Sequence, residues 1–271
     1  MAEPETAPKS APRLAEATLP EISLVVPVFN EEAGIASFVA TLRERLDSIV
    51  RSYEVVVVDN ASTDGTVAAL EPLLDGASVR LLRNEVNRGK GFSVRRGMLD
   101  ASGELRLMCD ADCNVSLDSL PQLIEAVDEV DVAIGSRVAG GAEVARQQPL
   151  RRRLVGWPFI ALTRGLMREP AHDIYCGFKL WRAPAAEAVF ARQRLDGWVF
   201  DAEALGLARR FGFRVREVGI AWADREGSKL SIPRVLVPAV RELLAARRSV
   251  RSLPRVHAGR APVACPRRAS G

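Results

Sequence analysis

Leu107-Met108-Cys109-Asp110-Ala111-Asp112 is a short apolar run that ends in two carboxylates separated by one residue. Side chains of a β-strand alternate between its two faces, so Asp110 and Asp112 would point the same way where such a strand ends. Carboxylates paired in this way can hold a hard divalent cation, which in turn can bind a diphosphate. The alternative is that the pair lies on an ordinary solvated turn.

A second run upstream favours a binding site over a solvated turn. Val55-Val56-Val57-Val58-Asp59 is also an apolar stretch that ends in a carboxylate, and turn residues and a helix start follow it in residues 60–66. Two such strand ends in one alternating pattern predict a single nucleotide site.

Strand-like and helix-like segments alternate through the first half of the chain. Hydrophobic patterns predict strands at residues 22–28, 55–58, 79–82, 105–109 and 132–135, and helices at 35–49, 67–74, from 90 onward and at 117–130. This order predicts an α/β fold with a mostly parallel sheet and helices on both faces. Ligands of such sheets bind beyond the carboxyl ends of the strands. The polar residues expected there are Asn30, Glu31, Asp59, Asp110, Asp112 and Arg137.

Composition excludes several classes of protein. At 271 residues, the chain is long enough for one large domain with extensions. The four cysteines lack C-x-x-C spacing and only two histidines are present, so neither a zinc site nor a disulfide framework is expected, and a reducing cytosolic compartment fits best. We expect no transmembrane helix, since no apolar run reaches about 18 residues, and no signal peptide.

The two ends of the chain differ from its middle. Residues 1–20 are rich in proline and predict a disordered lead, residues 21–230 predict the globular domain, residues 231–248 an amphipathic helix, and residues 249–271 a basic disordered tail. From Lys229 onward, Glu242 is the only acid among many arginines. This end would either meet acidic lipid headgroups or remain solvated. Nucleic acid is not an expected partner, because no recognised motif or interleaved aromatic residues accompany the arginines.

A further helix is predicted at residues 150–167. Apolar residues lie nearly all round it, and Arg151, Arg152 and Arg153 gather at its start. Such a helix fits either the surface of a membrane or a plain core position.

Several motifs together resemble a known family. They are residues 23–32 (SLVVPVFNEE), 57–66 (VVDNASTDGT), 87–91 (NRGKG), 110–112 (DAD), 173–182 (DIYCGFKLWR), 198–203 (WVFDAE), 217–222 (EVGIAW) and 227–229 (GSK). In this order they resemble the family-2 glycosyltransferases of the GT-A (Rossmann-like) fold. Within that family the chain is most similar to the dolichyl-phosphate glucosyltransferases and the dolichyl-phosphate mannose synthases.

The resemblance implies a set of residues around the sugar nucleotide. They are Pro27, Phe29, Asn30, Glu31, Asp59, Asp64, Lys90 and Asp110. Asp59 would accept a hydrogen bond from an N–H of the base, and Asp64 and Lys90 would lie near the ribose and the diphosphate. Alternatively, Asp64 could only form a turn and cap a helix, and Lys90 could be a surface residue.

The resemblance also implies a metal and a catalytic set. Mg²⁺ or Mn²⁺ would neutralise charge on the leaving nucleotide. The implied ligands are Asp110, Asp112 and Asn114, and the catalytic residues are Asp112, Asp173 and Arg137. Arg137 would clamp a phosphate with its planar fork. Asp173 would orient Lys179 or the acceptor, or else be an ordinary loop residue.

A polyprenyl phosphate is the implied acceptor. Its second pKa is about 6, so at neutral pH it is largely a dianion that needs positioning rather than a strong base. The acceptor-side segment would be about residues 145–180. The candidates for binding the acceptor phosphate are Arg151, Arg152, Arg153 and Lys179.

We therefore expect an inverting, metal-dependent hexosyltransferase that uses a nucleoside-diphosphate sugar and a polyprenyl or dolichyl phosphate. Glucose, from UDP-glucose, is favoured because residues 176–179 and 198–201 resemble the glucosyltransferase pattern most. The protein would be cytoplasmic and peripheral on the cytoplasmic face of a membrane, attached either directly or through a membrane partner protein. The alternatives are a family-2 transferase with a hydroxyl acceptor, and a non-catalytic nucleotide-sugar-binding module.

Overall fold

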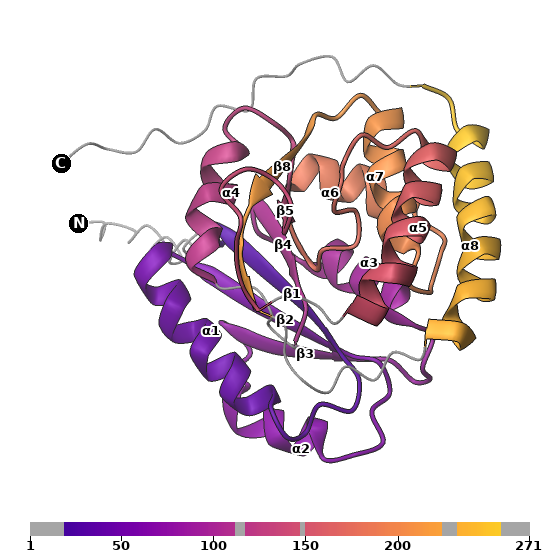
Figure 1. Ribbon diagram of the computed structural model, residues 1–271. Helices are drawn as coiled ribbons and strands as arrows, with labels where there is room; N and C mark the ends of the chain where they lie inside the picture. Colours follow the sequence, from indigo (N-terminus) through magenta and orange to yellow (C-terminus); the bar gives the residue numbers. More distant parts are fainter. Residues whose placement is uncertain (1–18, 112–116, 147–149, 224–231, 256–271) are drawn as a thin grey trace, which may run out of the picture.

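A seven-stranded β-sheet runs through the centre of the molecule (Figure 1). The structure, a computed structural model, describes residues 19–111, 117–146, 150–223 and 232–255. The strands are β1 (Ile22–Val28), β2 (Tyr53–Asp59), β3 (Val79–Arg83), β4 (Leu105–Cys109), β5 (Val132–Ser136), β7 (Phe178–Arg182) and β8 (Val215–Gly219). Their order is β3-β2-β1-β4-β7-β5-β8, and β7 alone in this sheet runs antiparallel to its neighbours. The prediction of an α/β fold with a mostly parallel sheet is confirmed.

Helices cover both faces of the sheet. They are α1 (Ile35–Ile49), α2 (Thr66–Leu70), α3 (Lys90–Asp100), α4 (Leu120–Ala126), α5 (Leu150–Met167), α6 (Ala183–Phe190), α7 (Phe200–Arg210) and α8 (Ile232–Ser252). A small second sheet pairs β6 (Glu143–Arg146) with β9 (Ala221–Ala223).

The inner strands are buried on both faces, which explains why they are continuous apolar runs. In β2, Val55 and Val57 belong to one core cluster, together with the buried side chains of α1. Val56 and Val58 belong to the other cluster, together with those of α3, α6 and α7. The sheet therefore separates two hydrophobic layers.

One predicted helix is shorter than its hydrophobic pattern indicated. The pattern covers residues 117–130, but the α-helical part, α4, ends at Ala126. The carbonyl oxygen of Val127 accepts a hydrogen bond from Nε of Arg182 at 2.7 Å, and the helix does not continue past it. Val127 and Val130 are nevertheless buried, which is why they fit the helical pattern.

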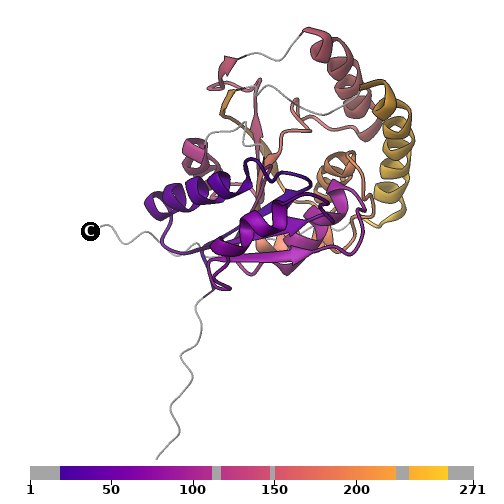
Figure 2. The same ribbon diagram turned by 90° about the horizontal axis from the view of Figure 1, so that it is seen from below.

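The C-terminal helix is longer than predicted. α8 continues to Ser252, past the predicted end at residue 248, and Arg210 of α7 binds the carbonyl oxygen of Leu253 just beyond it. α8 lies at the outer edge of the molecule beside α5 (Figure 1, Figure 2). Among the helices that the structure describes, none has the length and apolar character needed to cross a bilayer.

Candidate functional site

The carboxyl ends of three strands lie level at one edge of the sheet. Val28 pairs with Asp59 across β1 and β2, and Val25 pairs with Met108 across β1 and β4. Asp59 therefore ends β2 beside the end of β1, and Asp110 follows β4 directly. The two strand-end carboxylates are thus brought to the same edge of the sheet, as the topology predicted.

The segment after β1 is tied to the segment after β2. Asn30 has a positive φ of 55°, and its backbone N–H donates to Oγ of Ser62 at 2.9 Å. Its side-chain oxygen accepts a hydrogen bond from the backbone N–H of Thr63 at 2.8 Å, and the backbone N–H of Glu31 donates to Oγ1 of Thr66 at 2.8 Å. These bonds hold the two predicted nucleotide-binding segments as one unit.

The two predicted nucleotide-site aspartates in this unit are both engaged by their own loop. Asp59 is fully buried and accepts a hydrogen bond from the backbone N–H of Ser62 at 3.1 Å. Asp64 accepts hydrogen bonds from the backbone N–H and the hydroxyl of Thr66, at the start of α2, and from the N–H of Glu32. Desolvation would raise the pKa of Asp64, but these hydrogen bonds outweigh it and lower that pKa. Asp64 therefore does hold the start of α2, and a contact with the ribose stays a prediction.

A chain of asparagines links the end of β2 to the segment 87–91. Asn60 donates from its amide to the side-chain oxygen of Asn87 at 2.8 Å and accepts a hydrogen bond from the amide of Asn84 at 3.1 Å. The backbone N–H of Arg88 also donates to Asn60, at 3.2 Å. Asn60 thus positions the residues that precede Lys90.

The glycines of residues 87–91 allow a close approach between backbones. Gly89 has a φ of 109°, and a Cβ there would lie 2.3 Å from the carbonyl oxygen of Asp196. A Cβ on Gly91 would lie 2.4 Å from the carbonyl oxygen of Leu195. The carboxylate of Asp196 accepts hydrogen bonds from Nη2 of Arg88 at 2.8 Å and from Nη2 of Arg95 at 2.9 Å. The start of α3 is therefore fastened to the loop that precedes α7.

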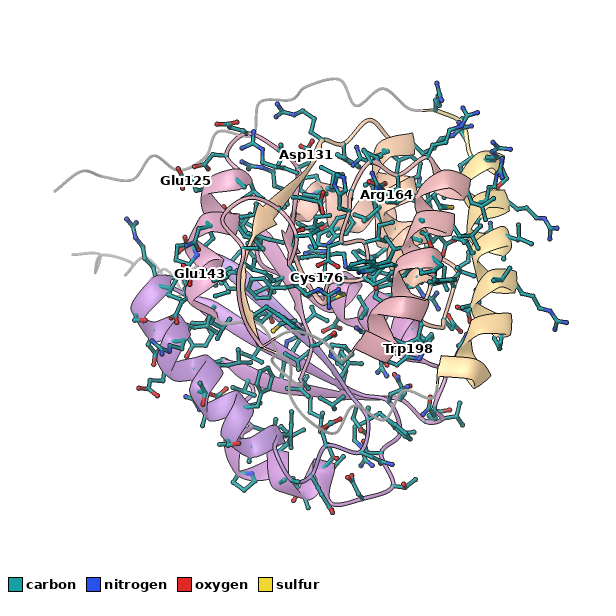
Figure 3. All side chains as sticks on the ribbon, in the orientation of Figure 1. Glu125, Asp131, Glu143, Arg164, Cys176 and Trp198 are labelled. Carbon is teal, nitrogen blue, oxygen red and sulfur yellow. The ribbon has the colours of Figure 1, made fainter. Side chains whose placement is uncertain are left out.

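Lys90 and Asp110 meet at the centre of this arrangement. The Nζ atom of Lys90 lies 2.6 Å from Oδ1 and 2.8 Å from Oδ2 of Asp110. The side chains are partly exposed, at 14% for Lys90 and 31% for Asp110. The indole ring of Trp198 lies near the ammonium group, with its centroid 5.3 Å from Nζ. Trp198 is half-exposed, and Figure 3 shows it towards the lower ends of α5 and α8.

Both the backbone and the carboxylate of Asp110 lie against Gly177. Its backbone N–H donates to the carbonyl oxygen of Gly177 at 3.1 Å, and a Cβ on Gly177 would lie 1.9 Å from Oδ2 of Asp110. Only glycine fits at this position while the carboxylate stays where it is.

The donor chemistry of Asp110 fits a hard divalent cation. Its oxygens already lie against a positive charge, the ammonium group of Lys90, and carboxylate oxygens are the ligands that Mg²⁺ and Mn²⁺ prefer. Asp112 and Asn114, the other predicted ligands, lie outside the described residues. Among the residues described, no group of three or more His, Cys, Asp or Glu side chains could hold a metal ion.

Arg137 and Asp173 form a second, more buried pair. Nε and Nη2 of Arg137 donate to the two oxygens of Asp173 at 2.7 and 2.6 Å, and the backbone N–H of Arg137 adds a third hydrogen bond at 2.9 Å. Burial alone would lower the pKa of Arg137, but the hydrogen bonds and charge of Asp173 outweigh it and raise that pKa. Glu217 accepts a hydrogen bond from the backbone N–H of Asp173 at 2.9 Å and fixes the loop.

Lys179 was predicted to bind the acceptor phosphate, but its side chain is buried in a different ion pair. It is 1% exposed, and its Nζ atom donates to Oδ1 of Asp201 at 2.6 Å and to the carbonyl oxygen of Cys176. The expectation that Asp173 orients Lys179 is wrong, because the carboxylate of Asp173 binds Arg137. Burial raises the pKa of Asp201, and the charge of Lys179 opposes that rise.

The helix predicted at residues 150–167 has a buried side and an exposed side, and its contact with a membrane surface stays a prediction. Its inner side belongs to the core, since Phe159 stacks on Tyr175 with ring centroids 5.6 Å apart and Thr163 hydrogen-bonds the Tyr175 hydroxyl. Its outer side exposes Trp157 and Leu162. Arg151, Arg152 and Arg153 lie in the first turn of this helix, α5, and their contact with an acceptor phosphate stays a prediction.

Comparison with known proteins identifies the family. Residues 23–190 match the family model described as glycosyl transferase family 2. This chain belongs to glycosyl transferase family 2. The segment matched runs from β1 to the end of α6, so it contains Asp59, Lys90, Asp110 and the Arg137–Asp173 pair.

Curated relatives extend the similarity beyond that segment. The dolichyl-phosphate beta-glucosyltransferase of Dictyostelium discoideum is 30% identical over 224 residues, which cover 77% of this chain and 68% of that protein. The human dolichyl-phosphate beta-glucosyltransferase is 30% identical over 237 residues, which cover 82% of this chain and 73% of the human protein.

Solved structures show the same fold at lower identity. Glucosyl-3-phosphoglycerate synthase from Mycobacterium tuberculosis is 21% identical, with a TM-score of 0.62 over 87% of this chain and 82% of that one. The same synthase has been solved with Mn²⁺, UDP-glucose and phosphoglyceric acid. Staphylococcus aureus TarS, solved with UDP-GlcNAc, has a TM-score of 0.54 at 19% identity, over 83% of this chain and 66% of that one.

Three residues lie in the candidate site although the sequence predicted no role for them. Trp198 lies beside Lys90, Gly177 packs on Asp110, and Asp196 fastens the start of α3. Trp198 and Gly177 both lie inside the family motifs, so the sequence indicated that these positions matter but did not predict their contacts. Asp196 carried no signal, because its partners Arg88 and Arg95 are about a hundred residues away in the chain.

Proposed function

We propose that this chain transfers glucose from UDP-glucose to a polyprenyl phosphate, such as dolichyl phosphate, with inversion at the sugar. The observation that carries the proposal is the identity of about 30% to dolichyl-phosphate beta-glucosyltransferases over more than three quarters of the chain. The geometry at the ends of β1, β2 and β4 supports it, because basic and acidic groups gather where a sheet of this kind binds its ligand.

The donor diphosphate would bind between Lys90 and Asp110. A divalent cation on Asp110, with Asp112 and Asn114 as further proposed ligands, would stabilise the charge of the leaving UDP. The ammonium group of Lys90 adds a second positive charge at the same place, at the N-terminus of the eleven-residue helix α3. Pro27, Phe29, Asn30 and Glu31 would line the nucleoside side, and Phe29 is partly exposed there.

The acceptor phosphate needs a positioned cation more than a base. As a dianion, its oxygen is already a nucleophile. Arg137 would supply the positioned charge, because Asp173 holds its guanidinium group in one orientation through two of its three nitrogens. Both Asp173 oxygens are taken up in that pair, which favours a phosphate acceptor over a hydroxyl group that would need Asp173 as its base.

We also propose that the protein works at a membrane surface as a peripheral protein. Trp157 and Leu162 on the outer side of α5 would enter the interface, and the arginines of α8 would face anionic headgroups. A membrane partner protein could provide further attachment.

The test is a transfer assay with labelled UDP-glucose, a short polyprenyl phosphate in detergent, and Mg²⁺ or Mn²⁺. We expect a labelled lipid product, and a rate lower by about a hundredfold or more in Asp110→Asn. Asp100→Asn is the matched control, because Asp100, the last residue of α3, has a similar exposed fraction and also pairs with a basic side chain, that of Arg80.

Three outcomes separate the candidate functions. Lipid product that depends on Asp110 supports the proposal. Transfer only to small hydroxyl acceptors, with none to the lipid phosphate, would replace it by the hydroxyl-transferase alternative. Binding of UDP-glucose without transfer to any acceptor would indicate a non-catalytic module.

A further inference from the structure

The carboxylate of Asp110 and the ammonium group of Lys90 form an ion pair. Both oxygens lie within 2.8 Å of Nζ, so the ammonium group faces the whole carboxylate rather than one corner of it. A hard divalent cation would approach the same oxygens, at about 2.0–2.2 Å. The two positive charges would then lie close together and repel each other.

Lys90 is the partner that can move. Asp110 is held by its backbone hydrogen bond to Gly177 and by the close packing of that glycine against its oxygens. Lys90 has a flexible four-carbon side chain, by contrast, and is the first residue of α3.

Two aromatic rings also lie near the ammonium group in this position. The ring centroids of Trp198 and Phe200 lie 5.3 and 5.9 Å from Nζ, and aromatic faces at this distance attract a cation. Trp198 is half-exposed, so an ammonium group that leaves Asp110 can move along this ring without being buried.

We propose that Lys90 competes with the divalent cation for Asp110. In the absence of donor the ammonium group holds the carboxylate, and binding of the cation moves it towards Trp198, where it meets the donor diphosphate. The inference rests on the proposed function for the metal and the donor. It adds an order of events, in which Lys90 opposes the cation alone and supports the cation together with the nucleotide.

The experiment measures Mn²⁺ affinity of the full-length chain by electron paramagnetic resonance of free Mn²⁺, without nucleotide and with UDP. Without nucleotide, Lys90→Met should bind Mn²⁺ about fivefold more tightly than the wild type, or more, because the competing charge is removed. With UDP present, the gain should disappear or reverse, because Lys90 then stabilises the diphosphate.

Arg88→Met is the matched control. Arg88 carries the same charge in the same segment, but it pairs with Asp196 at 2.8 Å and not with Asp110. Its loss should change Mn²⁺ affinity less than about twofold. An equal gain in both variants would mean that general electrostatics, and not direct competition, sets the affinity.

The remaining outcomes are also decisive. Circular dichroism checks that the variants fold, and Lys90→Gln replaces Lys90→Met if that variant does not. An unchanged or weaker Mn²⁺ affinity in the folded Lys90 variant, or no Mn²⁺ binding by any variant, would overturn the inference. Glucose transfer by the wild type together with unchanged Mn²⁺ affinity in the Lys90 variant would overturn the inference alone. The predicted gain in affinity without any transfer would leave the inference standing and refute the proposed function.

Discussion

Two lysine–aspartate pairs lie close enough to interact electrostatically, and they differ mainly in their exposure to solvent. Lys90 and Asp110 approach to 2.6 Å with side chains that are 14% and 31% exposed, and Lys179 and Asp201 approach to 2.6 Å with side chains that are 2% and 5% exposed. The partly exposed pair can exchange its partner for a ligand at little cost. The buried pair cannot, because either charge alone would be left without water or a counter-ion. We therefore expect the same chemistry to give an exchangeable contact in one place and a structural one in the other.

The largest effect we predict tests the buried pair. Lys179→Met should lower the free energy of unfolding by about 3–5 kcal/mol, since it leaves the charge of Asp201 buried without its partner. Lys90→Met should lower it by less than about 1 kcal/mol, because its pair is partly hydrated. Chemical denaturation of both variants measures the difference. Asp201→Asn added to Lys179→Met should recover part of the lost stability. Equal losses for the two lysine variants would show that burial does not distinguish the two pairs.

The next effect tests a pair of intermediate burial. Asp173 is buried and Arg137 is 24% exposed, so this pair should contribute to both stability and activity. Arg137→Lys keeps the charge but loses the planar fork, and we expect transfer to fall on the order of tenfold with a higher KM for the lipid phosphate. Steady-state kinetics with varied acceptor measures it. Arg216→Lys, at an exposed pair with Glu129, is the control and should leave KM unchanged.

A third prediction concerns Glu54, which lies near the start of β2, at the end of the strand opposite to Asp59. Glu54 accepts hydrogen bonds from Ser23, Ser102 and Arg80. Burial would raise the pKa of Glu54, but these bonds outweigh it and lower that pKa from 4.5 to about 2. Because the folded pKa lies below the unfolded one, the stabilisation is complete above about pH 5 and is lost as the pH falls towards 2.

Glu54→Gln should therefore lose about 1–3 kcal/mol of stability at pH 7 and show a flatter decline between pH 5 and about pH 2. Urea denaturation across that range measures it. Glu125→Gln, on the exposed side of α4 (Figure 3), is the control and should keep the slope of the wild type. The same slope in Glu54→Gln would show that Glu54 does not titrate as the structure implies.

The smallest effect concerns Trp198. Trp198→Ala removes an aromatic face near Lys90, which is worth about 0.5–1 kcal/mol at such an exposed site. We expect the KM for UDP-glucose to rise about two- to fivefold and the stability to stay within about 0.5 kcal/mol of the wild type. Trp198→Phe should keep most of the wild-type KM. A large loss of stability in Trp198→Ala would show that Trp198 has a structural role, like that of the buried pair.

Much of the fold was predictable from the sequence, because it depends on local patterns. β1 and β2 were predicted as strands from continuous apolar runs, and burial on both faces is the reason for those runs. α1 was predicted from residue 35 to residue 49, since its apolar residues recur at helical spacing. The end of α4 was not predictable, because Val127 and Val130 beyond it are buried and continue the helical hydrophobic pattern.

The site was predictable as a set of strand ends but not as a set of contacts. Asp59 and Asp110 could be placed at one edge because parallel strands end together. That Asp173 binds Arg137, and Lys179 binds Asp201, could not be read from these motifs. Both contacts depend on the position of β7, which enters the sheet antiparallel between β4 and β5.

Neighbouring residues encode the alternation of strands and helices, the family motifs and the carboxylates at the strand ends, so these features could be read along the chain. Which charged side chain meets which, and which pair stays exposed to solvent, depends on how distant segments pack in the folded protein. Lys90 and Lys179 are the same type of residue, and each lies in one of the family motifs. Their different environments arise from helices and strands that are brought together over long distances in the chain, and burial then decides whether an ion pair can open.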